Sequence, residues 1–329
     1  MRRVFSGIQP SGEMHIGNWL GAIRNYVALQ DDNECLYCVV DQHAITGNYD
    51  AATLGTRTRE MAISLLAAGV DPSRAVLFVQ SHVPQHTTLA WLLSTIAPLG
   101  DLERMTQFKD KSGRMESIPA GLLTYPVLMA ADILVYRAEA VPVGEDQLQH
   151  LELAREIARR WNAAFGDGTA FFPEPQPILS PARRIVGLDG QAKMSKSLGN
   201  TIGVMESPEA IWQKLRVAMT DPARVTKSDP GTPEICNVYA LHQHFSPPDT
   251  VEEVAVNCRT AAWGCIDCKK VLAANMTRTL APMRERGLEL RGQPGTVTEI
   301  LGDGAVTARA RAEATLAEVT ARMGFLPEE

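Results

Sequence analysis

Two short segments, far apart in the chain, carry residues that could bind phosphate. Segment 193–197 reads KMSKS, and its lysines, Lys193 and Lys196, are three residues apart in a polar run. Segment 5–20 reads FSGIQPSGEMHIGNWL, in which glycine and proline form a turn before a helical apolar pattern begins. A strand, a glycine-bearing turn and a helix N-terminus present N–H groups and the positive end of a helix dipole, which bind anions. Alone, segment 5–20 is also compatible with an ordinary βα turn that carries a solvated histidine, and segment 193–197 with a mobile polar loop.

Together, the PxGxxHIGN turn and the complete KMSKS loop resemble the class I aminoacyl-tRNA synthetases. Three intervening stretches, VVDQHAIT (39–46), MAADILVY (129–136) and VPVGEDQ (141–147), look like the tryptophanyl branch of that family. The resemblance covers nearly the whole chain and implies a two-step reaction. The carboxylate of L-tryptophan attacks the α-phosphate of ATP, giving an enzyme-held adenylate and pyrophosphate. The acyl group then moves to the 3′-terminal adenosine of tRNA(Trp).

The first of these steps needs no protein nucleophile, because the substrate supplies one. It needs alignment and positive charge at the phosphates, so lysines, backbone amides and Mg²⁺ suffice. The resemblance implies that the KMSKS lysines contact the β- and γ-phosphates, while His15 lies on the other side of the nucleotide. Lys109 and Lys111 in FKDKS add phosphate contacts or are simply a surface pair. The implied catalytic set is Lys193, Lys196, Ser195, Lys111 and His15.

The resemblance implies a larger nucleotide-binding set. The residues that follow a predicted strand at 141–143 face ribose and adenine, and the backbone near Ile185 contacts the base. The set is Gln9, Pro10, Ser11, Gly17, Asn18, Gly144, Glu145, Asp146, Ile185, Lys193, Met194, Ser195, Lys196 and Ser197.

Recognition of the amino acid side chain depends on Asp132. In a helix over 121–136, Tyr125, Met129 and Asp132 share one face. A carboxylate in so apolar a helix is costly without a partner, and the single N–H donor of indole matches it. The alternative is a structural carboxylate tied to an internal lysine or to a helix N-terminus.

The rest of the tryptophan-binding set divides into walls and polar contacts. Phe5, Val141 and Val143 are expected to wall the slot, while His43 and Gln147 hold the polar end of the amino acid. The complete set is Asp132, Phe5, Gly7, Gln9, His43, Tyr125, Met129, Val141, Val143 and Gln147.

Two alternative functions share parts of this pattern. In tyrosyl-tRNA synthetases the residue two before the first-strand glycine is typically tyrosine, which reads the substrate phenol, whereas this chain has Phe5 there. A site without that partner leaves a bound tyrosine hydroxyl unsatisfied, which favours tryptophan, as does HIGN in place of HIGH. The other alternative is a non-synthetase paralogue that binds tryptophan or RNA in a regulatory role. The intact KMSKS and HIGN motifs argue against it.

Four of the six cysteines form a C-x21-C-x6-C-x2-C set: Cys236, Cys258, Cys265 and Cys268. Four thiolates fit either tetrahedral Zn²⁺ or a [4Fe–4S] cluster, and spacing alone does not separate the two. Some bacterial members of the tryptophanyl family carry a [4Fe–4S] cluster at nearly this spacing, with a first gap one residue longer. The other reading is four small core side chains. Cys35 and Cys38 lie in a strand pattern and are read as core.

The elements that position these residues follow an alternating pattern. Runs 35–40 and 75–80 read as buried strands, and 51–69, 87–97 and 145–162 read as helices. This predicts an α/β fold in which a parallel sheet is covered on both faces and ligands bind outside the carboxyl ends of its strands.

The resemblance implies two domains. Residues 1–187 and 291–329 form a discontinuous, Rossmann-like nucleotide-binding domain. Residues 188–290 form a smaller helical, anticodon-side tRNA-binding domain that contains the KMSKS loop and the cysteine set.

Charge and composition limit the partners. A net charge of −6 over 329 residues argues against indiscriminate coating of nucleic acid. Residues 258–291 carry seven Lys or Arg against three Asp or Glu, an excess of four that suits a tRNA-facing surface or a solvated helix face. With no apolar signal region and no long apolar run, we expect a cytoplasmic protein without a membrane segment. The resemblance also implies a homodimer.

Overall fold

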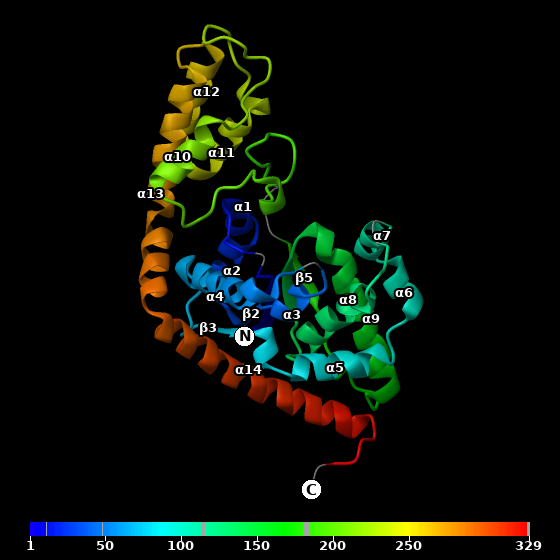
Figure 1. The fold of residues 1–329 in the computed structure, drawn as a ribbon. Helices are drawn as coiled ribbons and strands as arrows, with labels where there is room; N and C mark the ends of the chain where they lie inside the picture. Colours follow the sequence, from blue (N-terminus) through cyan, green and yellow to red (C-terminus); the bar gives the residue numbers. More distant parts are fainter. Residues whose placement is uncertain (11, 48, 114–115, 180–184, 328–329) are drawn as a thin grey trace. The chain divides into compact units, whose positions relative to one another are not determined.

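The computed structural model describes the chain except for residues 11, 48, 114–115, 180–184 and 328–329, and the side chains of Lys111 and Ser197 (Figure 1). The chain divides into two compact units. The first unit contains Met1–Gly12, Arg24–Pro181 and Gln293–Glu329. The second contains Glu13–Ile23 and Ala182–Gly292.

The first unit is built on a five-stranded parallel sheet with strand order β3-β2-β1-β4-β5. Its strands are β1 (Arg2–Ile8), β2 (Asn33–Val39), β3 (Ala75–Val79), β4 (Ala140–Val143) and β5 (Gln176–Leu179). The predicted α/β, Rossmann-like fold is confirmed, and Cys35 and Cys38 are buried in β2 as expected. The strand order reverses between β1 and β4, and ligands of such folds bind at the carboxyl ends beside that reversal.

Helices lie between the strands along the chain and after the last of them, as the alternating pattern predicts (Figure 1). They are α2 (Arg24–Leu29), α3 (Asp41–Ala44), α4 (Ala51–Ala67), α5 (Gln85–Ser94), α6 (Leu99–Arg104), α7 (Thr106–Ser112), α8 (Ala120–Leu134), α9 (Leu148–Phe165) and α14 (Pro294–Arg322). The helix predicted from residue 145 starts later, because Glu145–Gln147 form the 3₁₀ turn η3 before α9. At Gly304 of α14 a Cβ would lie 1.9 Å from the carbonyl oxygen of Leu77, so only glycine permits this close packing on β3.

The second unit is mainly helical. Its elements are α1 (Ile16–Asn18), the π-helical turn η1 (Trp19–Ile23), the 3₁₀ turn η4 (Lys196–Leu198), α10 (Pro208–Arg216), the 3₁₀ turn η5 (Pro233–Ile235), α11 (Asn237–Phe245), α12 (Pro248–Arg259) and α13 (Cys265–Gly292). Within it, Lys269 is buried and its Nζ donates to the carbonyls of Arg216 and Ala218 at 3.0 and 2.7 Å. This lysine, counted in the basic excess of 258–291, therefore caps the end of α10 instead of facing solvent.

Among the described residues, no helix is both long and apolar enough to cross a lipid bilayer.

Candidate active site

The HIGN turn forms a capped helix start in the second unit. His15 is the N-cap of α1: its Nδ1 accepts the N–H of Asn18 at 3.3 Å, and Asn18 Oδ1 accepts the N–H of His15 at 3.3 Å. This reciprocal pair of bonds is the capping-box arrangement, here made by His and Asn instead of Ser and Glu. It fixes both predicted nucleotide-binding side chains relative to the helix start.

The HIGN and KMSKS segments lie side by side within this unit. The N–H of Ile16 donates to the carbonyl of Ile202 at 2.9 Å, and the N–H of Val204 donates to Met14 at 2.9 Å. A Cβ on Gly17 would lie 3.4 Å from Met194 Cβ and 3.0 Å from His15 Nδ1. Glycine at this position therefore permits the close approach of the two segments.

The KMSKS loop is held by a side chain that pattern reading missed. Asn200 is buried: its Oδ1 accepts the N–H of Ser195 at 2.7 Å and its Nδ2 donates to Asp189 Oδ2 at 2.8 Å. The carbonyl of Ile185 accepts the N–H of Met194 at 3.1 Å, which joins the predicted base contact to the same loop. The buried Met194 side chain separates the exposed Lys193 from the half-buried Lys196. The loop is thus anchored at its centre and polar at its edges.

The two lysines affect the electrostatics of His15. Burial, followed by the positive charges of Lys196 and Lys193, lowers the pKa of His15 to about 4. The imidazole is therefore neutral near pH 7 and contributes hydrogen bonds. Positive charge at this place comes from the lysines.

In the first unit, the remaining predicted nucleotide contacts follow the carboxyl ends of β1 and β4. Gln9 comes directly after β1 and is exposed, whereas Pro10 is buried. Gly144 caps η3, and the side chains of Glu145 and Asp146 are exposed. This is the sheet edge at which the strand order reverses. Ser11, and the side chains of Ser197 and Lys111, lie outside the described residues; Lys109 is exposed on α7.

Asp132 is buried at the same edge of the sheet, with an exposed fraction of 2%. Its Oδ2 lies 2.7 Å from His43 Nε2, and its Oδ1 lies 2.7 Å from Gln80 Nε2 and 2.6 Å from His86 Nδ1. Burial alone would raise the pKa of Asp132, but the two imidazoles lower it below its usual value. The carboxylate is thus charged and held by partners from elements around it. Neither a lysine nor a helix N-terminus, the alternatives raised above, supplies them.

The other predicted tryptophan contacts surround this carboxylate unevenly. Tyr125 presents its ring edge-on to His43, with centroids 6.3 Å apart, and its hydroxyl lies 2.6 Å from His150 Nε2. Phe5 is buried and stacks on Tyr136 at 5.6 Å. Val141 is buried, Met129, Val143 and Gln147 are half-buried, and Gly7 is exposed.

His43 has a contact that the sequence pattern did not predict. Its Nε2 is bound to Asp132, and its predicted contact with the polar end of the amino acid stays a prediction. Gln80 and His86 were missed altogether. Gln80 could have been found, since it is the polar last residue of the predicted strand 75–80 and directly follows β3 in the structure. His86 carries no signal in the sequence pattern.

The four cysteines of the second unit gather around the start of α13. Cys265 and Cys268 lie in its first turn, Cys258 in the last turn of α12, and Cys236 directly before α11. Burial, followed by the neighbouring thiols of Cys236, Cys258 and Cys265, raises the pKa of Cys268 to about 12. Among the residues described, no three His, Cys, Asp or Glu side chains are arranged to hold a single metal ion. This finding supports neither the zinc nor the [4Fe–4S] prediction for the cysteine set.

Comparison with known proteins gives a consistent result. Residues 1–281 match the family described as tRNA synthetases class I (W and Y). Among curated proteins, the chain is 54% identical to a tryptophan–tRNA ligase of Deinococcus radiodurans, over 99% of each chain, and 44% identical to one of Thermotoga maritima, over 98% of this chain and 99% of the relative. Among solved structures, it is similar to tryptophanyl-tRNA synthetase of Campylobacter jejuni complexed with ADP and tryptophan. The TM-score is 0.90 at 34% identity, covering 98% of this chain and 100% of that one.

Proposed function

The chain belongs to the class I tRNA synthetases for tryptophan and tyrosine, and within that family it is a tryptophan–tRNA ligase; from this premise we propose how its residues divide the reaction. Its substrates are tryptophan, ATP and tRNA(Trp). The identity of its relatives favours the tryptophanyl assignment over a tyrosyl enzyme or a regulatory paralogue. The roles of individual residues are proposals supported by the geometry.

Phosphate activation is assigned to the second unit. Lys193 and Lys196 flank a loop anchored by Met194 and Asn200, directly beside the HIGN turn. Two ammonium groups at a fixed loop can stabilise the charge that builds on the β- and γ-phosphates as pyrophosphate leaves. Mg²⁺ fits this scheme as part of the ATP complex, because Mg²⁺ is commonly held by substrate phosphates with few protein ligands. The neutral His15 and Asn18 then serve as hydrogen-bonding groups for the nucleotide.

Selection of tryptophan is assigned to Asp132, and its hydrogen bonding is the observation that carries the proposal. An ionised carboxylate accepts about four hydrogen bonds, and the described side chains supply three. The position left is on Oδ2, beside the bond from His43. An indole N–H fills this position. The phenol of a bound tyrosine would leave its hydroxyl without one hydrogen-bond partner, because tyrosyl-tRNA synthetases supply that partner from a tyrosine where this chain has Phe5.

Tryptophan-dependent ATP–pyrophosphate exchange tests the whole assignment. We expect exchange with tryptophan, and at least about 10³-fold lower kcat/KM with tyrosine, since a buried polar group left unpaired is rejected strongly. Comparable exchange with both amino acids would overturn the assignment of specificity to this site.

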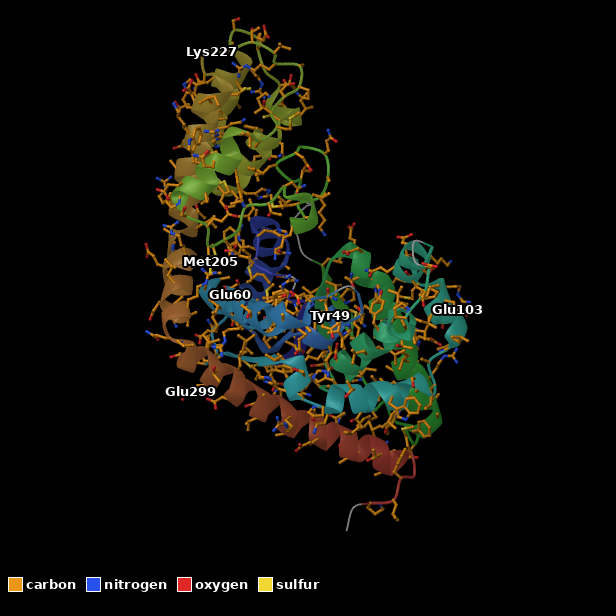
Figure 2. All side chains as sticks on the ribbon, in the orientation of Figure 1. Tyr49, Glu60, Glu103, Met205, Lys227 and Glu299 are labelled. Atoms are coloured by element: carbon orange, nitrogen blue, oxygen red, sulfur yellow. The ribbon has the colours of Figure 1, made fainter. Side chains whose placement is uncertain are left out.

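We also propose a [4Fe–4S] cluster on Cys236, Cys258, Cys265 and Cys268. Each thiolate of such a cluster binds a different iron, so the sulfurs need only surround a common centre. Burial and then neighbouring thiols of the set raise the pKa values of Cys258 and Cys268, which supports a common centre. Arg224 Nη1 lies 4.0 Å from Cys258 Sγ and places positive charge beside it. Figure 2 shows Lys227 at the tip of the loop that also carries Arg224. The cluster would hold α11, α12 and α13 together beside this loop.

Metal analysis distinguishes the possibilities for the cysteine set. After anaerobic purification we expect about four iron and four acid-labile sulfide atoms per chain, and loss of both in Cys265→Ser. Cys35→Ala, which alters a core cysteine of β2, should keep the iron. Stoichiometric zinc without sulfide, or no metal at all, would remove the cluster proposal.

The homodimer and the domain limits remain proposals. For the dimer we propose the face around Trp91 of α5, which is 71% exposed beside a cavity of about 960 Å³ lined by Ile45, Ala90, Val127 and Leu128 among others. An exposed tryptophan next to an apolar cavity is typical of an interface hot spot. The domain limits of 187 and 291 rest on the family resemblance, and the cytoplasmic location rests on the apolar pattern of the sequence.

Substitution of Trp91 tests this dimer face. Trp91→Glu is expected to weaken self-association by at least about 30-fold, because truncation of a hot-spot tryptophan costs ~2 kcal/mol or more. Light scattering coupled to size exclusion at micromolar concentration would measure the change. Val306→Glu, at a 64% exposed position on α14, introduces the same charge elsewhere and should leave the dimer intact. An unchanged dimer in Trp91→Glu would place the interface on another face.

A further inference from the structure

Asp132 is hydrogen-bonded to a buried chain of polar groups that have no role in the proposed reaction. His86 and Tyr136 form this chain: His86 Nδ1 lies 2.6 Å from Asp132 Oδ1, and His86 Nε2 lies 2.7 Å from the Tyr136 hydroxyl. His86 has no exposed surface and Tyr136 is 1% exposed. Neither ring can therefore reach a substrate directly, and any effect on substrate selection must act through Asp132.

The partners of Asp132 Oδ1 have defined hydrogen-bonding directions. Gln80 Oε1 accepts the backbone N–H of Gln42 at 3.1 Å, so its Nε2 must be the end that donates to Asp132. Burial raises the pKa of the Tyr136 hydroxyl well above its ordinary value, so this hydroxyl keeps its proton. Among the described side chains, His86 Nε2 is the acceptor placed for that proton. Nδ1 of His86 then carries the hydrogen that points at Asp132.

Aromatic packing fixes the two rings in place. Phe5 stacks on Tyr136. The ring of Phe78 meets Tyr136 edge-on, with centroids 5.7 Å apart, and lies tilted to His86, with centroids 5.9 Å apart. The carboxylate thus receives two donors on Oδ1, one from the 3₁₀ turn Gln80–His82 after β3 and one from α5, and one donor on Oδ2 from α3. This asymmetry leaves the accepting position on Oδ2.

We propose that His86, oriented by Tyr136, is a positioning residue for tryptophan specificity: it saturates Oδ1 of Asp132, so that Oδ2 is presented to the indole N–H. The inference rests on the proposed role of Asp132 and extends it to residues that contact no substrate. Without His86, the carboxylate can rotate its accepting positions away from the indole.

Two amino acids that differ in the ring N–H separate this role from a general structural one. 3-(Benzothiophen-3-yl)alanine has nearly the shape of tryptophan, but sulfur replaces the ring N–H. Kinetics of ATP–pyrophosphate exchange with both amino acids should be measured for the unmodified protein, His86→Leu, His86→Asn and Tyr136→Phe. His82→Leu is the matched control, because His82 is exposed four residues away.

We expect His86→Leu to raise the KM for tryptophan by roughly 10- to 100-fold with kcat little changed, the loss expected of a hydrogen bond to a charged group. The benzothiophene analogue should change by less than about threefold, so selectivity for the ring N–H falls. His86→Asn, whose amide can replace the Nδ1 donor, should restore most of the selectivity, and Tyr136→Phe should lie between the two. His82→Leu should retain full selectivity.

The possible failures are distinguishable. If the unmodified protein shows no tryptophan-dependent exchange, the proposed function itself fails. If Asp132→Asn loses selectivity for the ring N–H but His86→Leu retains it, only the role of His86 is overturned. Equal losses for both amino acids would mean that His86 is merely structural. If His86→Leu does not fold, the selectivity for tryptophan over the benzothiophene analogue in His86→Asn and Tyr136→Phe decides. The proposal is contradicted if Tyr136→Phe keeps full selectivity while His86→Asn loses it, because His86→Asn is expected to be the more selective of the two.

Discussion

Replacing Asp132 with asparagine is expected to lower kcat/KM for tryptophan activation by about 10²- to 10³-fold. The amide keeps the volume of the carboxylate but turns one acceptor into a donor. That donor must face His43 on one side, or Gln80 and His86 on the other, all of which donate to the carboxylate in the native protein. The charge is lost in either orientation, and the accepting position for the indole is lost as well when the amide nitrogen takes the place of Oδ2. Exchange kinetics with saturating ATP would measure the effect.

A neighbouring aspartate provides the control for this experiment. Asp41, at the start of α3, accepts bonds from the N–H and the hydroxyl of Ser81, close in sequence to the same partners. Asp41→Asn should change tryptophan kinetics by less than about fivefold, because its bonds are exposed and their net value is small. If Asp132→Asn instead retains normal tryptophan kinetics, the tryptophan pocket has been assigned to the wrong place.

The charge state of Asp132 adds a pH expectation of known sign. A carboxyl group whose pKa is lowered on folding stabilises the folded protein above its unfolded pKa, and this contribution is lost only as pH falls through the lowered value. Its ordinary value is 3.8, so Asp132 stays ionised throughout the neutral and mildly acidic range. The KM for tryptophan should therefore be free of an Asp132 titration between about pH 8 and pH 5.

The sequence could identify Asp132 but not the network that holds it. Helical spacing placed Tyr125, Met129 and Asp132 on one face, and chemistry marked a carboxylate in an apolar helix as unusual. Its partners lie 46 to 89 residues away in the chain, and no local pattern joins them. They meet because β2 and β3 end at one edge of a parallel sheet, which only the strand order reveals.

In the phosphate site, too, the sequence identifies some residues, whereas the contacts that hold them are revealed only by the fold. The motifs identified His15, Gly17 and the KMSKS lysines from local residue types, and the fold brings the two segments together. Asn200 was overlooked, because an asparagine in a polar loop is ordinary in sequence. Its importance comes from burial and from bonds to Ser195 and Asp189. Likewise, the excess positive charge of 258–291 could not reveal that Lys269 is buried beneath α10.

Substitution of Lys196 is expected to have a second large effect, on the rate of tryptophan activation. Lys196→Ala is expected to lower kcat for activation by about 10²- to 10³-fold, the range found when a preorganised group that stabilises developing charge is removed. The KM for tryptophan should change little, because the amino acid site belongs to Asp132 and its neighbours in the first unit. This separation of kcat from KM is the expected signature of an interaction made mainly in the transition state.

Lys270 is the appropriate control, since it is an exposed lysine of the same unit whose ion pair with Asp267 spans 3.8 Å. Lys270→Ala should leave exchange unchanged, because a surface ion pair contributes little. The pKa of His15 supplies an independent readout for Lys196→Ala. Since the charge of Lys196 helps to lower that pKa, its removal should move the His15 titration upward from about 4, as followed by NMR of the imidazole. A kcat reduced together with an unmoved His15 titration would mean that Lys196 acts away from the HIGN turn, and the convergence of the two motifs on one phosphate site would then be wrong.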